Sequence, residues 1–256
     1  MKNAIPTVAK SMELLLLLSV SGQRFRQSEI ARRLDITPST AYRLLQTLAA
    51  SGWVAKDSER RWGTAAGLMT LAFALRDEIR VLENCRGILD ALAHDRGIHC
   101  KINLRGGHEM VHVMDASPLR PYVTLEGNHP LVVGATAGAL LCDEPESELL
   151  RLVGECEADI PEKHDPQILL DAVDDVRRKG WTYSVSPNRW RVAAIAAPIR
   201  SADGAVIAAL TFVGLEPDFT PKKIPAITKL LLASAKACAS TGAWISNPRV
   251  GASHAD

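Results

Sequence analysis

Long apolar segments are missing from this sequence. Near the N-terminus the longest apolar run covers only residues 14–18, whereas a membrane-spanning helix needs about 20 apolar residues. The same region lacks the small-residue cleavage site of a secretory signal peptide. We therefore expect a protein that stays in the cytoplasm and makes no contact with a membrane.

Cysteine is scarce, and the usual motifs of several enzyme classes are missing. The five cysteines include no CxxC pair, which predicts reduced thiols and neither a disulfide framework nor a zinc cluster. The sequence has no G-x-S-x-G elbow, no P-loop and no G-x-G-x-x-G stretch, motifs typical of hydrolases and of nucleotide-binding enzymes. We expect no catalytic residues, no cofactor and no metal ion. The cysteines are Cys85, Cys100, Cys142, Cys156 and Cys238.

The net charge of +1 is small, but the charges are distributed unevenly along the 256 residues. Residues 1–63 contain ten basic and five acidic side chains, a net of +5, so the remainder has 20 basic and 24 acidic ones, a net of −4. This asymmetry is typical of a protein in which one domain meets phosphate groups and the other does not. The length fits one large domain or two of ordinary size.

Residues 7–19 predict an amphipathic helix with Thr7 as its cap. Residues 27–48 then predict two short helices joined by a turn at Asp35. Thr37 and Pro38 begin the second of these helices, because a capping hydroxyl is followed by proline at the first helical position. In the first helix of the chain the positions at helical spacing are Val8, Met12, Leu15 and Leu16.

The second helix of this pair has an apolar side and a polar, basic side, which is how a protein presents a helix to the DNA major groove. Hydroxyl groups can bond phosphates, and arginine can bond phosphate or guanine. An ordinary solvated helix face is the alternative interpretation. The residues that we expect near DNA are Ser28, Thr37, Ser39, Thr40, Tyr42 and Arg43.

A β-hairpin is predicted after these helices. Residues 53–56 alternate like a strand, residues 57–60 form a turn, and residues 61–64 can return as a second strand. Helices followed by such a hairpin make a winged helix-turn-helix. Arg60 and Arg61 would then lie at the tip of the wing, within reach of the DNA backbone or minor groove.

The run SEIARRLDITPSTAYRLLQTLAASGWVAKD, residues 28–57, resembles the DNA-binding domain of the IclR family of bacterial transcriptional regulators. The family usually has glycine where this chain has Asp35, and aspartate tolerates the left-handed backbone that such a turn requires. The resemblance implies a DNA-binding regulator. The residues in register are Ser28, Glu29, Ala31, Ser39, Thr40, Arg43, Leu45, Leu48, Gly52 and Trp53.

The larger second part predicts helices beside a mostly antiparallel sheet, which is an α+β domain. Gly106-Gly107 and Asp203-Gly204 are hairpin signals between apolar strands, and Gly180 ends a helix. The expected helices are residues 67–80, 81–94, 149–153, 167–179 and 224–243. The expected strands are residues 99–104, 110–114, 122–125, 195–199 and 205–213.

This second part also resembles the IclR-type effector-binding domain, which is GAF-like, and the whole resemblance covers roughly residues 5–245. In several family members loop amides hold a small carboxylate effector, and side chains that are commonly Asp, Cys, Ser and Ser add contacts. The four positions that match these side chains are, in the same order, Val185, Ala194, Thr211 and Val213, and of these only Thr211 keeps a hydroxyl. We therefore expect a less polar pocket that takes an aromatic or larger organic acid, or binds nothing. The matching positions are Gly134, Ala135, Thr136, Ala137, Val185, Ala194, Thr211 and Val213.

Residues 108–112, His-Glu-Met-Val-His, match the H-E-x-x-H pattern of zinc hydrolases. That chemistry needs both histidines one turn apart on a helix. The preceding Gly106-Gly107 turn and the alternation around Val111 favour a strand, where residues four apart lie about 13 Å from each other. A zinc-dependent hydrolase is therefore the weaker alternative, and a pure interaction module is a third one that the basic winged helix disfavours.

The sequence thus predicts an α+β protein with an N-terminal winged helix-turn-helix at residues 1–66. A linker helix at residues 67–82 would join it to a GAF-like sensor domain at residues 83–246, followed by a flexible tail at residues 247–256. The implied function is that of a transcriptional regulator rather than an enzyme. A homodimer or tetramer on a palindromic double-stranded operator is expected, because one such domain offers few DNA contacts.

Overall fold

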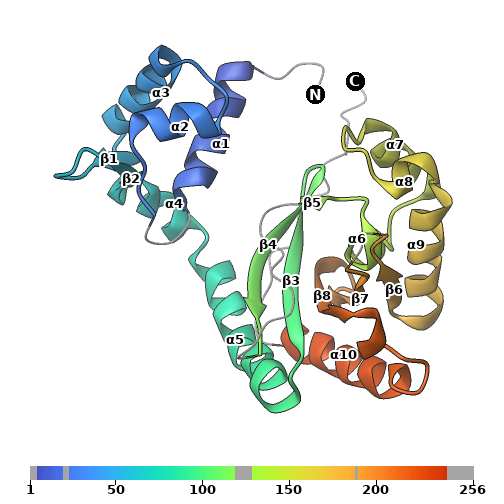
Figure 1. The fold of residues 1–256 in the computed structure, drawn as a ribbon. Coiled ribbons are helices and arrows are strands. Elements are labelled where there is room, and N and C mark those ends of the chain that lie inside the picture. Colours follow the sequence, from blue (N-terminus) through green and yellow to red (C-terminus); the bar gives the residue numbers. More distant parts are fainter. Residues whose placement is uncertain (1–4, 20–22, 119–128, 188–189, 241–256) are drawn as a thin grey trace. The chain divides into compact units, whose positions relative to one another are not determined.

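The computed structural model describes residues 5–19, 23–118, 129–187 and 190–240 (Figure 1). The chain divides into two compact units, residues 1–76 and 77–256. The predicted strand at residues 122–125 and the predicted tail at residues 247–256 lie outside the described residues. The α+β class with an N-terminal winged helix-turn-helix is confirmed.

The N-terminal unit contains three helices and a two-stranded wing. The helices are α1 (Pro6–Ser19), α2 (Gln27–Arg33) and α3 (Pro38–Ala50), and the antiparallel strands are β1 (Val54–Lys56) and β2 (Trp62–Thr64). A 3-10 turn, η1 (Ala66–Leu68), and a short helix, α4 (Met69–Ala74), follow. The core of this unit consists of Leu14, Leu18, Phe25, Ile30, Leu34, Leu44, Leu45, Val54 and Trp62.

Local chemistry explains the turn and the start of α3. Asp35 has φ 49°, so it adopts the left-handed conformation for which the family uses glycine. Thr37 caps α3, because its Oγ1 accepts a hydrogen bond from the backbone nitrogen of Thr40 at 3.1 Å. Pro38 occupies the first turn, where it sacrifices no backbone hydrogen bond. Both sequence predictions for this turn are confirmed.

The prediction for α1 was wrong in two respects. The helix begins at Pro6, so Thr7 lies inside it and is not its cap. The buried positions are Leu14 and Leu18, whereas Val8, Met12 and Leu16 are 47%, 61% and 60% exposed. The run of leucines at residues 14–18 fits more than one helical stripe, and only packing against the rest of the unit decides which stripe is buried.

The connection after the wing also differs from the prediction. The expected helix break near residue 80 is absent, and α5 runs without interruption over Arg76–Arg96. The break lies at Leu75, where α4 ends. Neither proline nor glycine marks this point, so the sequence contains no breaker that could have located it.

The C-terminal unit is built on a six-stranded antiparallel sheet with the order β5-β4-β3-β8-β7-β6. Gly107 and Gly204, both with positive φ, make the tight turns of the β3–β4 and β7–β8 hairpins. The strands are β3 (His99–Gly106), β4 (Glu109–Ala116), β5 (His129–Pro130), β6 (Thr182–Val185), β7 (Val192–Arg200) and β8 (Val206–Leu215).

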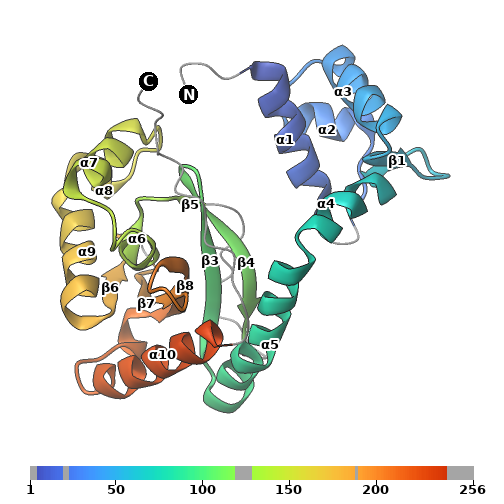
Figure 2. The same ribbon diagram turned by 180° about the vertical axis from the view of Figure 1, so that it is seen from behind.

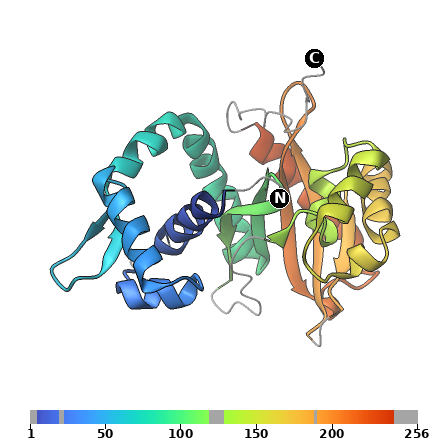
Figure 3. The same cartoon turned by 90° about the horizontal axis from the view of Figure 1, so that it is seen from above.

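Helices cover both faces of this sheet. Figures 2 and 3 show α6, α7 and α9 on one side of it. One hydrophobic core joins the sheet to α5 and α10, and a second core joins the opposite face to α6, α7 and α9. The helices of this unit after α5 are α6 (Gly134–Leu140), α7 (Glu146–Glu155), α8 (Pro161–His164), α9 (Gln167–Lys179) and α10 (Ile224–Ala239), with a 3-10 turn η2 (Glu216–Asp218). Gly180 ends α9 with φ 81°, as predicted.

Strand alternation assigns each residue of the sheet to one of the two cores. In β7, Ile195 and Ala197 face α5 and α10, while Ala196 faces α6 and α9. In β8, Phe212 faces α5 and α10, and Ala209 faces α6. The face toward α6 carries most of the positions that the family resemblance assigns to an effector.

Candidate nucleic-acid interface and effector site

Helix α3 buries one side and presents the other to solvent. Ala41, Leu44 and Leu45 are buried in the core of the N-terminal unit. Ser39, Tyr42 and Arg43 are exposed, with Tyr42 at 52%. The side chains that the sequence predicted for DNA therefore lie on the free side of this helix.

Two of the predicted residues have structural partners at the start of α3. The hydroxyl groups of Thr37 and Thr40 lie 2.9 Å apart and share a hydrogen bond. The side chain of Gln27 on α2 donates a hydrogen bond to the backbone oxygen of Pro38 at 3.1 Å. These contacts fix the N-terminal end of α3 against the N-terminal end of α2, where Ser28 is exposed.

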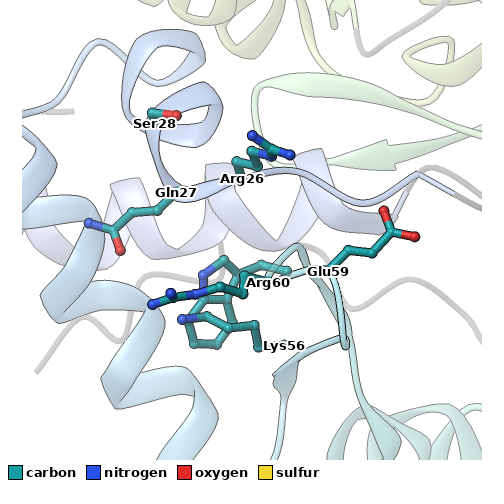
Figure 4. Close-up of a pocket in the computed structure, with 7 residues that line it drawn as sticks. Arg26, Gln27, Ser28, Lys56, Glu59 and Arg60 are labelled. Carbon is teal, nitrogen blue, oxygen red and sulfur yellow. The ribbon is translucent and has the colours of Figure 1, made fainter.

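A basic hollow of about 490 Å³ lies between the start of α2 and the wing. Three cationic side chains contribute to it, Arg26, Lys56 and Arg60, against one carboxylate, that of Glu59. Figure 4 shows Lys56 and Arg60 pointing to the same side, while Glu59 points away from them. The lining residues are Arg26, Gln27, Ser28, Lys56, Glu59, Arg60 and Trp62.

The wing is internally braced. Lys56 Nζ lies 4.8 Å from the centre of the buried Trp62 ring, a cation–π contact between β1 and β2. The backbone nitrogen of Arg61 donates a hydrogen bond to Asp57, and this bond is the main reason why the pKa of Asp57 lies below its ordinary value. The Arg61 guanidinium also contacts Asp57 and Glu59, at 3.4 and 2.9 Å.

The structure therefore separates the two arginines that were predicted at the wing tip. Arg61 is paired with wing carboxylates, whereas Arg60 lines the hollow. Sequence reasoning missed Arg26 and Lys56 as members of this site. Their charge was visible in the basic first quarter, but nothing in the local pattern showed that a helix start and a strand would meet.

In the C-terminal unit, the predicted effector positions fall into two groups. Thr136 on α6 and Thr211 on β8 share a hydrogen bond between their hydroxyls at 2.9 Å. Val213 lies two residues from Thr211 on the same face and pairs with Ala194 of β7. Val185 packs with the core on the α5 and α10 side, so its side chain lies away from this group.

The backbone amides at the start of α6 already have partners within the chain. The nitrogen of Gly134 donates to Glu162 Oε1 at 2.9 Å, and the nitrogen of Ala135 donates to Ser184 Oγ at 2.8 Å. Sequence reasoning missed Glu162 and Ser184, since no local signal distinguishes a buried glutamate on α8 from a solvated one. Two of the loop amides that family members offer to a carboxylate are thus occupied here.

In the stretch of α6 that resembles the family pattern, Gly138 stands where the family has lysine. A Cβ atom there would lie 2.9 Å from the backbone oxygen of Ala172. Helices α6 and α9 therefore approach too closely for any side chain at this position. The departure from the family pattern reflects tight packing of these two helices.

The H-E-x-x-H segment does not form a zinc site. His108 lies in the turn and Glu109 to His112 lie in β4, so the two histidines are not one helical turn apart. His108 faces Glu155 at 3.6 Å, whereas His112 contacts Asp115 at 3.1 Å. A strand cannot bring both rings to one metal ion, so this geometry does not support the hydrolase alternative.

Comparisons with known proteins identify the two units. Residues 7–58 match the family model of the IclR helix-turn-helix domain, and residues 73–240 match that of the bacterial transcriptional regulator IclR C-terminal domain. The chain belongs to the IclR family of bacterial transcriptional regulators. It is therefore a transcriptional regulator with a DNA-binding helix-turn-helix domain and an effector-binding domain, as the sequence predicted.

Individual relatives agree with this assignment. The HTH-type transcriptional regulator KipR of Bacillus subtilis is 25% identical over 237 residues, which cover 90% of this chain and 94% of KipR. The IclR regulator of Alicyclobacillus acidocaldarius has the same fold, with a TM-score of 0.72 at 22% identity over 93% of this chain and 99% of that one.

A third relative was solved with a ligand. An IclR homolog of Microbacterium hydrocarbonoxydans complexed with 4-hydroxybenzoate has a TM-score of 0.69 at 19% identity, over 92% of this chain and 98% of that one.

Within the part of this chain that the structure describes, no helix is long and apolar enough to cross a membrane.

Proposed function

We propose that this IclR-type regulator binds a palindromic operator as a homodimer or a tetramer of the chain. The observation that carries the proposal is the exposed polar face of α3 beside a hollow lined by three cations. Docking α3 in the major groove would bring Ser39, Tyr42 and Arg43 to base edges and phosphates. The hollow, with Arg26, Lys56 and Arg60, suits a phosphate of the DNA backbone.

Exposed apolar side chains on α1 and α4 support self-association. Ile5, Val8, Met12 and Leu16 recur at helical spacing, and Met69, Leu71 and Phe73 are each at least 49% exposed. Exposed apolar side chains that form a contiguous patch usually mark an interaction surface, and the spacing of the α1 set allows one. We propose that a second copy of this chain covers these apolar side chains, because a two-fold operator requires two DNA-binding domains in a fixed relation.

The domain limits remain proposals as well. We propose a winged helix-turn-helix at residues 1–66, a linker at residues 67–82 and an effector-binding domain at residues 83–246. Helix α5 begins the effector-binding domain, because the helical break at Leu75 lies next to the boundary between the two units. A change in that domain could then alter the spacing of paired DNA-binding domains, which is how an effector would change operator affinity.

The effector is proposed to be an aromatic or larger organic acid. The face that carries Thr211 also carries the apolar side chains of Ala194 and Val213, where family members commonly have Cys and Ser. The 4-hydroxybenzoate complex of a protein with the same fold supports an aromatic acid in a domain of this kind. Small polar dicarboxylates are expected not to bind.

A binding experiment tests the DNA part of the proposal. Full-length protein is titrated onto the DNA upstream of its own gene and onto an unrelated fragment of equal length, at several salt concentrations. We expect tighter binding to the upstream fragment, by about 1000-fold or more, with affinity that falls steeply as salt rises. Equal and salt-insensitive binding to both fragments would favour a plain interaction module, and light scattering of the complex gives the number of chains.

A further inference from the structure

Glu162 places a buried carboxylate at the start of α6. Its side chain comes from α8, and of the four residues of that helix Glu162 alone is buried, with 5% of the residue exposed. Its Oε1 accepts a hydrogen bond from the backbone nitrogen of Gly134 at 2.9 Å. Helix α8 lies beside α7 and α9 (Figures 1 and 2), and the Glu162 side chain is what joins it to α6.

The carboxylate of Glu162 is poorly compensated in this position. Its second oxygen, Oε2, is buried and has no hydrogen-bond partner among the residues that the structure describes. Within those same residues, no basic side chain forms an ion pair with it. A buried carboxylate loses its hydration and depends on the partners that the fold supplies. One amide hydrogen bond offsets only part of that loss, so the docked position of α8 is weakly held.

A ligand carboxylate could replace that of Glu162 at little electrostatic cost. The Gly134 nitrogen would keep a charged acceptor, while the Glu162 carboxylate would return to water and regain its hydration. The apolar part of the acid would then decide the exchange, because its burial releases free energy that the carboxylate alone does not supply. Val133 and Ala194 are partly buried apolar residues that pack against the core beside α6.

We propose that Glu162 is an internal ligand of the effector-binding domain. Its carboxylate binds the Gly134 amide when no effector is present, and an organic-acid effector binds by replacing it, which releases α8. The proposal rests on the effector-binding function proposed above and adds an autoinhibitory contact to it. Acids with a large apolar part displace Glu162, whereas small acids such as acetate do not.

Rescue by acetate tests the proposal in the full-length protein. Glu162→Ala removes the internal carboxylate and leaves the Gly134 nitrogen without its acceptor. Acetate well above its dissociation constant should bind there and raise the unfolding midpoint of this variant by about 2–4 °C. Acetamide, a neutral molecule of similar shape, should leave the midpoint unchanged. A Glu162→Ala protein that acetate does not stabilise would overturn the proposal.

Three further proteins locate the effect of acetate. The wild-type protein and Glu162→Gln should gain no stability from it, because each keeps an acceptor for the Gly134 nitrogen. Glu146→Ala, at an exposed position of α7, is the matched control and should also gain none. Equal stabilisation of all four proteins would overturn the proposal, since acetate would then act on the fold in general.

Hydrogen exchange of the wild-type protein tests the release of α8 without any variant. The backbone amides of Gly134 and of α8 should exchange at least about 100-fold faster than those of the buried strand β8, because local opening needs less free energy than global unfolding. Equal protection of Gly134 and β8 would contradict the proposal. This measurement decides the question if Glu162→Ala does not fold.

Titration of 4-hydroxybenzoate separates this inference from the proposed function. The acid should bind Glu162→Ala at least about tenfold more tightly than the wild-type protein, because it no longer competes with Glu162. Equal affinity for the two proteins would contradict the internal ligand alone. If the acid binds neither protein while acetate still stabilises Glu162→Ala, the result counts against the proposed aromatic effector and the internal ligand stands.

Discussion

Ser184 accepts a hydrogen bond at 2.8 Å on its Oγ from the backbone nitrogen of Ala135, a residue 49 positions earlier in the chain. This contact joins the edge strand β6 to the first turn of α6. The Ala135 residue is only 1% exposed, so no solvent is available to replace the hydroxyl. The start of α6 is thus held by a side chain from a distant strand.

Ser184→Ala is expected to destabilise the C-terminal unit. The substitution leaves the buried amide of Ala135 without an acceptor, which costs about 1–3 kcal/mol. Differential scanning calorimetry of the full-length protein measures the change in the unfolding midpoint, and Ser184→Thr should lose less because it keeps a hydroxyl. The exposed Ser147→Ala is the control; equal midpoints for Ser184→Ala and this control would refute the role of the contact.

Arg43→Ala should weaken operator binding while leaving folding and self-association unchanged. Arg43 is exposed on the free side of α3, and loss of an arginine contact to a base or phosphate costs about 1–3 kcal/mol. Fluorescence anisotropy with the operator fragment measures the loss, and Arg178→Ala on α9 is the matched control. Unchanged affinity in Arg43→Ala would mean that α3 does not enter the major groove.

Lys56→Ala and Arg60→Ala should weaken binding to all DNA sequences by similar factors. The hollow that they line is proposed to hold a backbone phosphate, which carries no sequence information. Each substitution should reduce the dependence of log affinity on log salt by about one unit. Arg61→Ala should have a smaller effect, since Asp57 and Glu59 already pair with it. A salt slope identical to that of the wild-type protein would exclude the hollow as a phosphate site.

His129 predicts how stability changes with pH. Burial, followed by the nearby Lys101 and His112 charges, lowers the pKa of His129 below its ordinary value of 6.5. The folded state therefore favours the neutral ring, and the resulting stability is present above pH 6.5 and is lost as pH falls through the lower folded-state pKa.

The measurement for His129 is the unfolding midpoint between pH 7 and pH 5. We expect the midpoint of the wild-type protein to fall with pH, and that of His129→Gln to fall less. His164→Gln is the control, because the His164 side chain is 71% exposed and pairs with Asp159 on the surface. A steeper fall in His129→Gln than in the wild-type protein would reverse the predicted sign.

The sequence by itself determined the local structure of the helix-turn-helix and its wing. The Thr37–Pro38 start of α3, the turn at Asp35 and the wing after Gly52 depend on residues a few positions apart, and capping and backbone preferences act over that range. The stop of α9 at Gly180 is local for the same reason. The resemblance to the IclR family rested on residues in register along the chain, such as Ser28, Arg43 and Gly52, and it was confirmed over both units.

Only the tertiary structure decided which faces are buried and which distant residues meet. His99, Lys101 and Asn103 alternate along β3 and therefore share a face. Because all three side chains are polar, the sequence predicts that this face lies in water. The structure buries it, because β3 lies in the middle of the sheet. Likewise Glu162 reaches Gly134 across 28 residues. Periodicity defines the faces of an element, but long-range packing chooses what covers each of them.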